Sequence, residues 1–144
     1  MKHDKLIAEA SVLINAPVDR VWRALTTPEM IRKYLMGTEV TCEWKPGSPI
    51  TFEGEYQGRK YKDKGEIKKI EPPRTLQMTY WSSMGGKVDK PENYNLVTYD
   101  LAPVEGMAKL TVTQDNVATE NEKEHAAGNW KMVLAKLRTV MEQE

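Results

Sequence analysis

The sequence has few of the residues that disulfide, metal or redox chemistry requires. Its only cysteine is Cys42, so no disulfide forms within the chain and no second thiol is there to share a metal. Its two histidines are His3 and His125, and the motifs GxGxxG, GxxxxGK[ST], HExxH and GxSxG are all missing. These absences argue against a nucleotide loop, a zinc protease site and a serine hydrolase elbow. We therefore expect no cofactor, no metal and no assignable catalytic residue.

The chain also lacks an excess of charge of either sign. The 21 Lys and Arg residues balance 21 Asp and Glu residues, whereas nucleic-acid binding draws on a basic excess. A short basic run at residues 59–64 is interrupted by Tyr61 and Asp63, which is typical of a solvated strand face or turn. We expect no nucleic-acid partner.

Long apolar runs are missing as well. No segment approaches the roughly 18 apolar residues of a membrane span, and no apolar region follows the first residues as it would in a signal peptide. Together with the single cysteine, this predicts a cytoplasmic protein without a membrane span. The 144 residues, 40% of them hydrophobic and 29% charged, suit one globular domain over residues 1–144.

The N-terminal third predicts a strand followed by two short helices. Residues 6–14 are short and apolar-rich, and Pro17 and Pro28 each suit the first turn of a helix. Apolar residues recur at helical spacing after each proline, and Gly37 suits the end of the second helix.

From residue 38 the apolar period changes to two, which is typical of strands. Turn signals at Pro46-Gly47, Gln57-Gly58, Pro72-Pro73 and residues 103–106 separate the runs, and residues 82–92 form a long polar loop. Gly65 marks a bulge or a close approach of two strands. Strands joined in sequence by short turns predict an antiparallel meander of about six strands after the helices.

The C-terminal segment predicts one uninterrupted helix from about 120 to 142. Thr119 and Glu122 have the spacing of a capping box, and one apolar stripe runs through Trp130, Leu134 and Leu137. A helix this long needs a partner for its stripe, so it must lie along the sheet. The fold class is therefore α+β, a helix-grip fold in which a curved antiparallel sheet of six or seven strands wraps around the C-terminal helix.

Several short sequence motifs, in this order, resemble those of the START-like superfamily, also called polyketide-cyclase-like or SRPBCC. The motifs are INAP at 14–17, VWRALT at 21–26, GEI at 65–67, EPPRTL at 71–76, VTYDL at 97–101, KLTVT at 109–113, and Trp130 with Leu134 and Leu137. Within the superfamily, the chain is similar to the branch homologous to the C-terminal domain of the heat-shock-protein-90 ATPase activator. The resemblance covers essentially the whole chain. It implies an apolar cavity between the long helix and the sheet, and a role as co-chaperone module, carrier or cyclase.

Aromatic and small residues on the inward faces are the candidate lining of this cavity: Trp22, Tyr34, Trp44, Phe52, Met78, Tyr80, Tyr99, Ala127 and Trp130. The same pattern suits a filled core, and the sequence leaves that choice open. We expect the cavity beside the first half of the long helix, under the two short helices, with residues 82–92 as a gate.

Three functions remain in view. The first is non-enzymatic binding or carriage of a small apolar molecule. The second is a protein-interaction, co-chaperone-like module, and the third is a cyclase-like or hydrolase-like enzyme that uses a polar group in the cavity. The expected partners are a small apolar molecule or a protein, and the expected state is a monomer or a weak homodimer.

Overall fold

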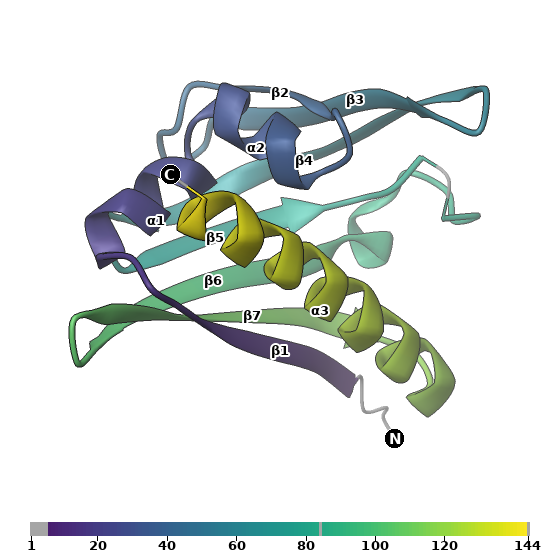
Figure 1. Cartoon of the computed structure of the whole chain (residues 1–144). Helices are drawn as coiled ribbons and strands as arrows, with labels where there is room; N and C mark the ends of the chain where they lie inside the picture. The colour runs from purple at the N-terminus through teal and green to yellow at the C-terminus, as the bar shows by residue number, and fades with distance from the viewer. Residues whose placement is uncertain (1–5, 84, 144) are drawn as a thin grey trace.

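A computed structural model describes residues 6–83 and 85–143 of the chain (Figure 1). Their order along the chain confirms the expected strand, two short helices, six strands and long helix. The elements are β1 (Leu6–Ile14), α1 (Val18–Leu25), α2 (Pro28–Tyr34), β2 (Glu39–Cys42), β3 (Pro49–Tyr56), β4 (Arg59–Glu71), β5 (Thr75–Tyr80), the 3-10 helix η1 (Pro91–Asn93), β6 (Asn95–Val104), β7 (Met107–Val117) and α3 (Glu120–Glu142).

The strands form one antiparallel sheet in the order β1-β7-β6-β5-β4-β3-β2. Figure 1 shows the sheet curving around α3, with α1 and α2 covering the end of the sheet near the C-terminus. This arrangement confirms the helix-grip fold class. Among the described residues, no helix combines the length and the apolar character that crossing a bilayer requires.

Two backbone features fix how the central strands meet. Gln57 and Gly58 both have positive φ, 51° and 80°, which is the geometry of a tight hairpin turn between β3 and β4. At Gly65, a Cβ atom would lie 1.7 Å from the carbonyl oxygen of Thr79 on β5. Of the two alternatives that the sequence left open at Gly65, a bulge or a close approach, the structure shows the close approach, and only glycine fits there.

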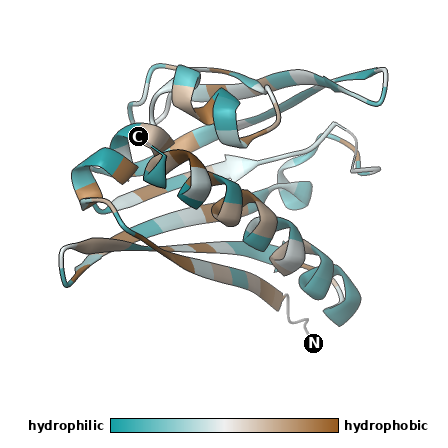
Figure 2. Cartoon of the chain, viewed as in Figure 1, coloured by the Kyte–Doolittle hydropathy of each residue, from teal (hydrophilic) through white to brown (hydrophobic). Residues whose placement is uncertain are grey.

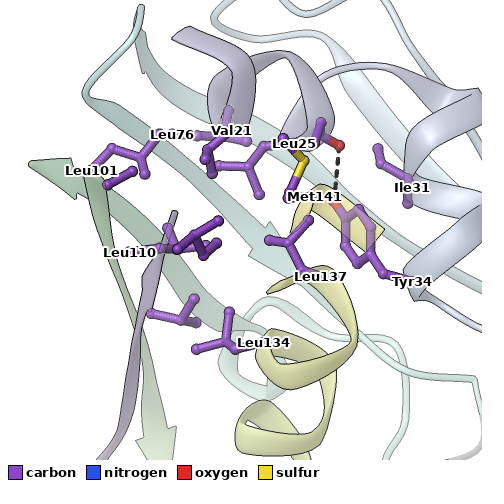
Figure 3. Close-up of a cluster of buried hydrophobic side chains, with 14 of the residues drawn as sticks. Val21, Leu25, Ile31, Tyr34, Leu76, Leu101, Leu110, Leu134, Leu137 and Met141 are labelled. Atoms are coloured by element: carbon purple, nitrogen blue, oxygen red, sulfur yellow. Dashed lines mark hydrogen bonds between the residues drawn. The ribbon is translucent and has the colours of Figure 1, made fainter. Parts of the chain in front are cut away.

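The core gathers around the second half of α3. Leu134, Leu137 and Met141 are buried there, and Figure 3 shows them facing side chains from α1, α2 and the sheet. Those partners include Val21, Leu25, Ile31, Tyr34, Leu76, Leu101 and Leu110. Burying a leucine side chain contributes roughly 1.5–3 kcal/mol, so this end of the helix anchors the fold.

The first half of α3 has a different character. Thr119 caps the helix by accepting a hydrogen bond from the Glu122 backbone N–H at 3.1 Å, as the capping box predicted. Figure 2 shows the first turns of α3 as hydrophilic and the later turns as increasingly hydrophobic. This half of the helix is therefore free to line a polar or mixed surface.

The polar segment expected as a long loop and gate at residues 82–92 has several contacts in its described part. Lys64 on β4 forms an ion pair with Asp89, the Trp81 indole N–H donates to the Lys87 carbonyl, and Asn116 of β7 donates to the Glu92 carbonyl. The short helix η1 ends the segment. Two of these contacts, those of Lys64 and Asn116, come from side chains more than 20 positions away in the sequence, so local patterns did not show them.

Candidate functional site

A cleft with a volume of about 1030 Å³ lies between the first half of α3 and the concave face of the sheet. Strands β3 to β7 form its floor, α3 from Asn121 to Val133 forms one wall, and Leu35 and Thr38 of the turn after α2 contribute to another. Residues of the segment after β5, including Trp81 and Lys87, lie at its edge. The cleft therefore begins where the leucine core of α3 ends.

Two aromatic pairs shape the interior of the cleft. Phe52 and Tyr80 meet edge to face with ring centroids 5.6 Å apart and an interplanar angle of 72°. Tyr99 and Trp130 meet in the same way at 5.9 Å and 88°. Edge-to-face pairs are a favoured aromatic geometry, so each pair presents fixed aromatic surface. Leu35, Met78, Val97 and Val133 add aliphatic surface.

Trp130 is the link between helix and sheet. Its indole Nε1–H donates to Oε1 of Gln114 on β7 at 2.9 Å. A half-buried indole normally finds such a partner, and the bond fixes the ring plane against Tyr99. The orientation of this wall of the cleft is therefore set by a hydrogen bond as well as by packing.

A buried carboxylate stands on the opposite side of the floor. Asp63 of β4 is 8% exposed, and it accepts hydrogen bonds from the Tyr80 hydroxyl at 2.6 Å, the Ser83 N–H at 2.9 Å and the Ser83 hydroxyl at 3.1 Å. Burial, reinforced by the hydrogen bond to Asp63, raises the pKa of Tyr80 far above its ordinary value. Tyr80 is therefore a neutral donor to Asp63 at any physiological pH.

Two more hydroxyls line the cleft near α2. Thr38 donates to the Leu35 carbonyl at 2.6 Å and lies 2.6 Å from the Tyr61 hydroxyl. Because the single proton of Thr38 is already donated, Tyr61 must be the donor of the second bond. This pair closes the turn after α2 onto β4.

Tyr99 has a different polar environment. Within residues 6–83 and 85–143, its hydroxyl makes no hydrogen bond with another side chain or the backbone, and burial raises the pKa of Tyr99 above its ordinary range. A neutral hydroxyl without a protein partner in a cleft wall is a polar group that a bound molecule can satisfy.

The edge of the cleft carries further polar side chains. His125 and Asn129 of α3 are on one side, and Asn93, Asn95 and Asn116 are on the other. No three His, Cys, Asp or Glu side chains gather in a metal-binding arrangement anywhere in the described part of the chain. His3 lies outside the described residues.

The structure places the nine candidate residues in three groups. Those that line the cleft are Phe52, Met78, Tyr80, Tyr99 and Trp130. Trp22 and Trp44 are half-buried and pack against the core, and Tyr34 is buried in it with its hydroxyl donating to the Ala24 carbonyl at 3.1 Å (Figure 3). Ala127 does not line the cleft, although Ala126 does, because one residue rotates a helix position by about 100°.

Sequence reasoning missed Asp63 as a cleft residue. In the sequence it interrupts a run of basic residues, yet on β4 it is in phase with Ile67, which is fully buried. Because side chains alternate along a strand, the period of two would have placed Tyr61, Asp63 and Ile67 on the inner face. Thr38 and Gln114 gave no comparable signal, since their bonds to Tyr61 and Trp130 join positions distant in sequence.

The fold and the position of the cleft define the class of protein. A curved antiparallel sheet that grips a long C-terminal helix is the START-like, or SRPBCC, fold. The structure of Ara h 8.0201 shares it with a TM-score of 0.78 at 11% identity, over 98% of this chain and 100% of that chain. The solution structure of the Aha1 dimer from Colwellia psychrerythraea has a TM-score of 0.75 at 18% identity, over 95% and 96%.

The chain belongs to the family described as Activator of Hsp90 ATPase homolog 1-like protein, whose profile matches residues 15–142. The solution structure of ChR145 from Cytophaga hutchinsonii is similar throughout, with 41% identity, a TM-score of 0.86, and coverage of 99% of this chain and 97% of that one. A search among curated proteins finds no match. Family and fold together are those of a ligand-binding or co-chaperone-like module.

Proposed function

We propose that this protein binds a small, largely apolar molecule in the cleft between α3 and the sheet. The observation that carries the proposal is the cleft itself, about 1030 Å³ in volume and lined by two aromatic pairs with a few placed polar groups. Binding sites for small molecules have this size and this composition. The free thiol of Cys42 suits a reducing compartment, so we include a cytoplasmic location in the proposal.

Two features support binding over simple packing. Asp63, Gln114 and Thr38 each have hydrogen-bond partners within the wall, so the wall keeps its shape without a ligand. The Tyr99 hydroxyl, in contrast, has no hydrogen-bond partner among the described residues, so it can bond to a bound molecule. A wall that is preorganised in this way loses little entropy when a ligand enters.

The test compares two tryptophan substitutions on the same helix. Ala126→Trp adds an indole to the cleft, whereas Ala135→Trp adds it to an exposed position of α3 outside the cleft. Both change helix propensity equally. Titration with the neutral fluorescent probe N-phenyl-1-naphthylamine should show binding by the wild type and Ala135→Trp, and at least tenfold weaker binding by Ala126→Trp.

Equal probe binding by all three proteins would place the probe elsewhere and contradict the proposal. Absence of binding by the wild type would contradict it as well. Native mass spectrometry of the purified protein adds an independent readout, because a carrier should retain part of its small molecule through purification.

Membership of the activator family favours a second candidate, a co-chaperone-like protein-interaction module. Addition of the chain to an Hsp90-type chaperone should then raise the rate of ATP hydrolysis in proportion to the complex formed. An unchanged rate at a saturating concentration would remove this candidate. The relative from Colwellia psychrerythraea is described as a dimer. Sedimentation over a hundredfold concentration range distinguishes the two expected states of this chain: a weak homodimer should associate as concentration rises, and a monomer should not.

A further inference from the structure

We propose that Asp63 makes the cleft selective for organic cations, meaning aromatic or aliphatic molecules that carry an ammonium group. This inference rests on the proposed binding function and specifies its ligand class. Three observations carry it: a buried carboxylate with no counter-ion in the described part of the chain, aromatic rings from the strands on both sides of that carboxylate, and an excess of acidic over basic residues among those that line the cleft.

Among the residues that the structure describes, none pairs a positive charge with Asp63. It is 8% exposed, and none of the ion pairs in residues 6–83 and 85–143 includes it. Its sequence neighbours Lys62 and Lys64 project to the other face of β4, because side chains alternate along a strand, and Lys64 is engaged by Asp89 and by the Trp81 ring. Buried charges are normally paired, so this one calls for a cation.

The carboxylate still has room to accept. One of its oxygens receives both bonds from Ser83, and the other receives the Tyr80 hydroxyl as its one donor among residues 6–83 and 85–143. A carboxylate offers about four acceptor positions, so one position on the second oxygen is left. Since Asp63 lines the cleft, a ligand N–H can reach it without displacing a protein donor.

Aromatic rings flank this position. Phe52 lies directly opposite Asp63 in the pairing of β3 with β4, so the two side chains share the inner face of the sheet. Tyr80 reaches Asp63 from β5, and its ring meets Phe52 edge to face at 5.6 Å. Aromatic faces attract ammonium groups through their quadrupole, which adds to the attraction of the carboxylate.

The charged residues around the rest of the cleft also favour a positively charged ligand. Its lining residues include the acids Asp63, Glu122 and Glu124 and the base Lys87, together with His125. A cleft with mostly negative walls attracts cations and repels anions. The exposed Glu122 and Glu124 attract a cationic ligand as it approaches the cleft, while Asp63 contacts the ligand once it is bound.

The experiment compares three probes that share one ring system: 1-naphthylmethylammonium, neutral 1-naphthylmethanol and anionic 1-naphthoate. Isothermal titration of the wild type should show the cation binding at least tenfold more tightly than the neutral probe, with the anion weakest. Asp63→Asn, which keeps the size and most hydrogen bonds of the side chain, should reduce the cation-to-neutral ratio to about one while the neutral probe binds as before.

Glu53→Gln is the matched control. Glu53 is exposed on β3, does not line the cleft, and its substitution makes the same change in net charge. It should leave the probe ratio within twofold of the wild type. The wild-type ratio needs no variant, so it tests the inference even if Asp63→Asn fails to fold.

The outcomes separate the two proposals. Equal binding of cation and neutral probe by the wild type overturns the cation inference and leaves the binding function standing. The same holds if Asp63→Asn folds and retains the full cation preference. If none of the three probes binds, the binding function itself is wrong.

Discussion

Substitution of Gly65 by alanine tests how closely β4 and β5 are held together beside the cleft. The new Cβ would lie 1.7 Å from the Thr79 carbonyl oxygen and 2.6 Å from its carbonyl carbon. Both atoms belong to the backbone, so relief requires the strands to separate by more than an ångström. A flexible side chain could move aside, but a strand that is paired on both edges cannot do so cheaply.

The expected loss follows from the contacts at this point. Overpacking costs about 1–3 kcal/mol. Separation also weakens the bond from the Glu66 N–H to the Thr79 hydroxyl and the two backbone bonds between Lys64 and Trp81, each contributing about 0.5–1.5 kcal/mol. We expect Gly65→Ala to lower the free energy of unfolding by about 3–5 kcal/mol, which for a chain of this size lowers Tm by roughly 10 °C or more.

Gly128→Ala is the control, because it makes the same chemical change on α3. A Cβ there would meet no atom within 4 Å, and alanine favours a helix interior over glycine by roughly 0.5–1 kcal/mol. Urea unfolding followed by circular dichroism should therefore give shifts of opposite sign for the two variants. A loss below about 1 kcal/mol for Gly65→Ala, with unchanged m-value, would refute the proposed contact between the strands.

Three further predictions concern the core, the cleft wall and the tyrosines. Leu137→Ala, at a fully buried position, should cost about 2–5 kcal/mol in urea unfolding, and a loss under about 1 kcal/mol would mean that the α3 stripe is not the core. Trp130→Phe keeps an aromatic ring but loses the bond to the sheet, so it should cost about 1 kcal/mol by thermal unfolding; an unchanged Tm would show that the bond contributes nothing. Burial raises the pKa of Tyr34, Tyr80 and Tyr99 above the ordinary 10.0, so as pH rises the unfolded chain loses these protons before the folded chain does. The contribution of the three protonated tyrosines to the free energy of unfolding is therefore complete below pH 10 and should be lost as pH rises further. Absorbance at 295 nm should show these three titrating only on unfolding, and a smooth titration of all six tyrosines in the folded state would contradict it.

The sequence was sufficient for the architecture because the signals of that architecture are local. The stripe through Leu134 and Leu137, the Thr119 cap and the Gln57-Gly58 turn each depend on residues within a few positions. The approach at Gly65 was also visible, since an isolated glycine inside a strand often marks a bulge or a neighbouring backbone close by. The sequence signals for these features are local, so they can be recognised without knowing which segments meet in the fold.

The lining of the cleft was harder to predict because it depends on where a residue lies along the sheet relative to α3, as well as on which face of the sheet it occupies. Tyr34 and Tyr99 are the same residue type, and both were expected to face inward. Tyr34 lies where α2 packs near the end of α3, and its hydroxyl is satisfied by Ala24. Tyr99 lies further along the sheet, beside Trp130, where the helix no longer fills the space. Only the long-range position of α3 separates these two environments.

The two halves of α3 explain how the fold can hold both a firm core and an open cleft. Leucines and a methionine fill the space over the sheet in the second half, and they supply the burial that holds the helix in place. The first half therefore need not contribute large side chains, and at Ala126 and Asn129 it does not. An opening of about 1030 Å³ with purely apolar walls would tend to collapse, because apolar surface is favourably removed from water.

The polar groups of the wall oppose that collapse. Asp63, Thr38 and Gln114 are held by partners within the wall, and closing the cleft would have to break those bonds or bury the remaining acceptors without partners. A polar lining also lets solvent occupy the space until a ligand displaces it. The same residues therefore keep the cleft open and give it chemical selectivity, which is why the charge on Asp63, rather than the volume of the cleft, should decide which molecules bind.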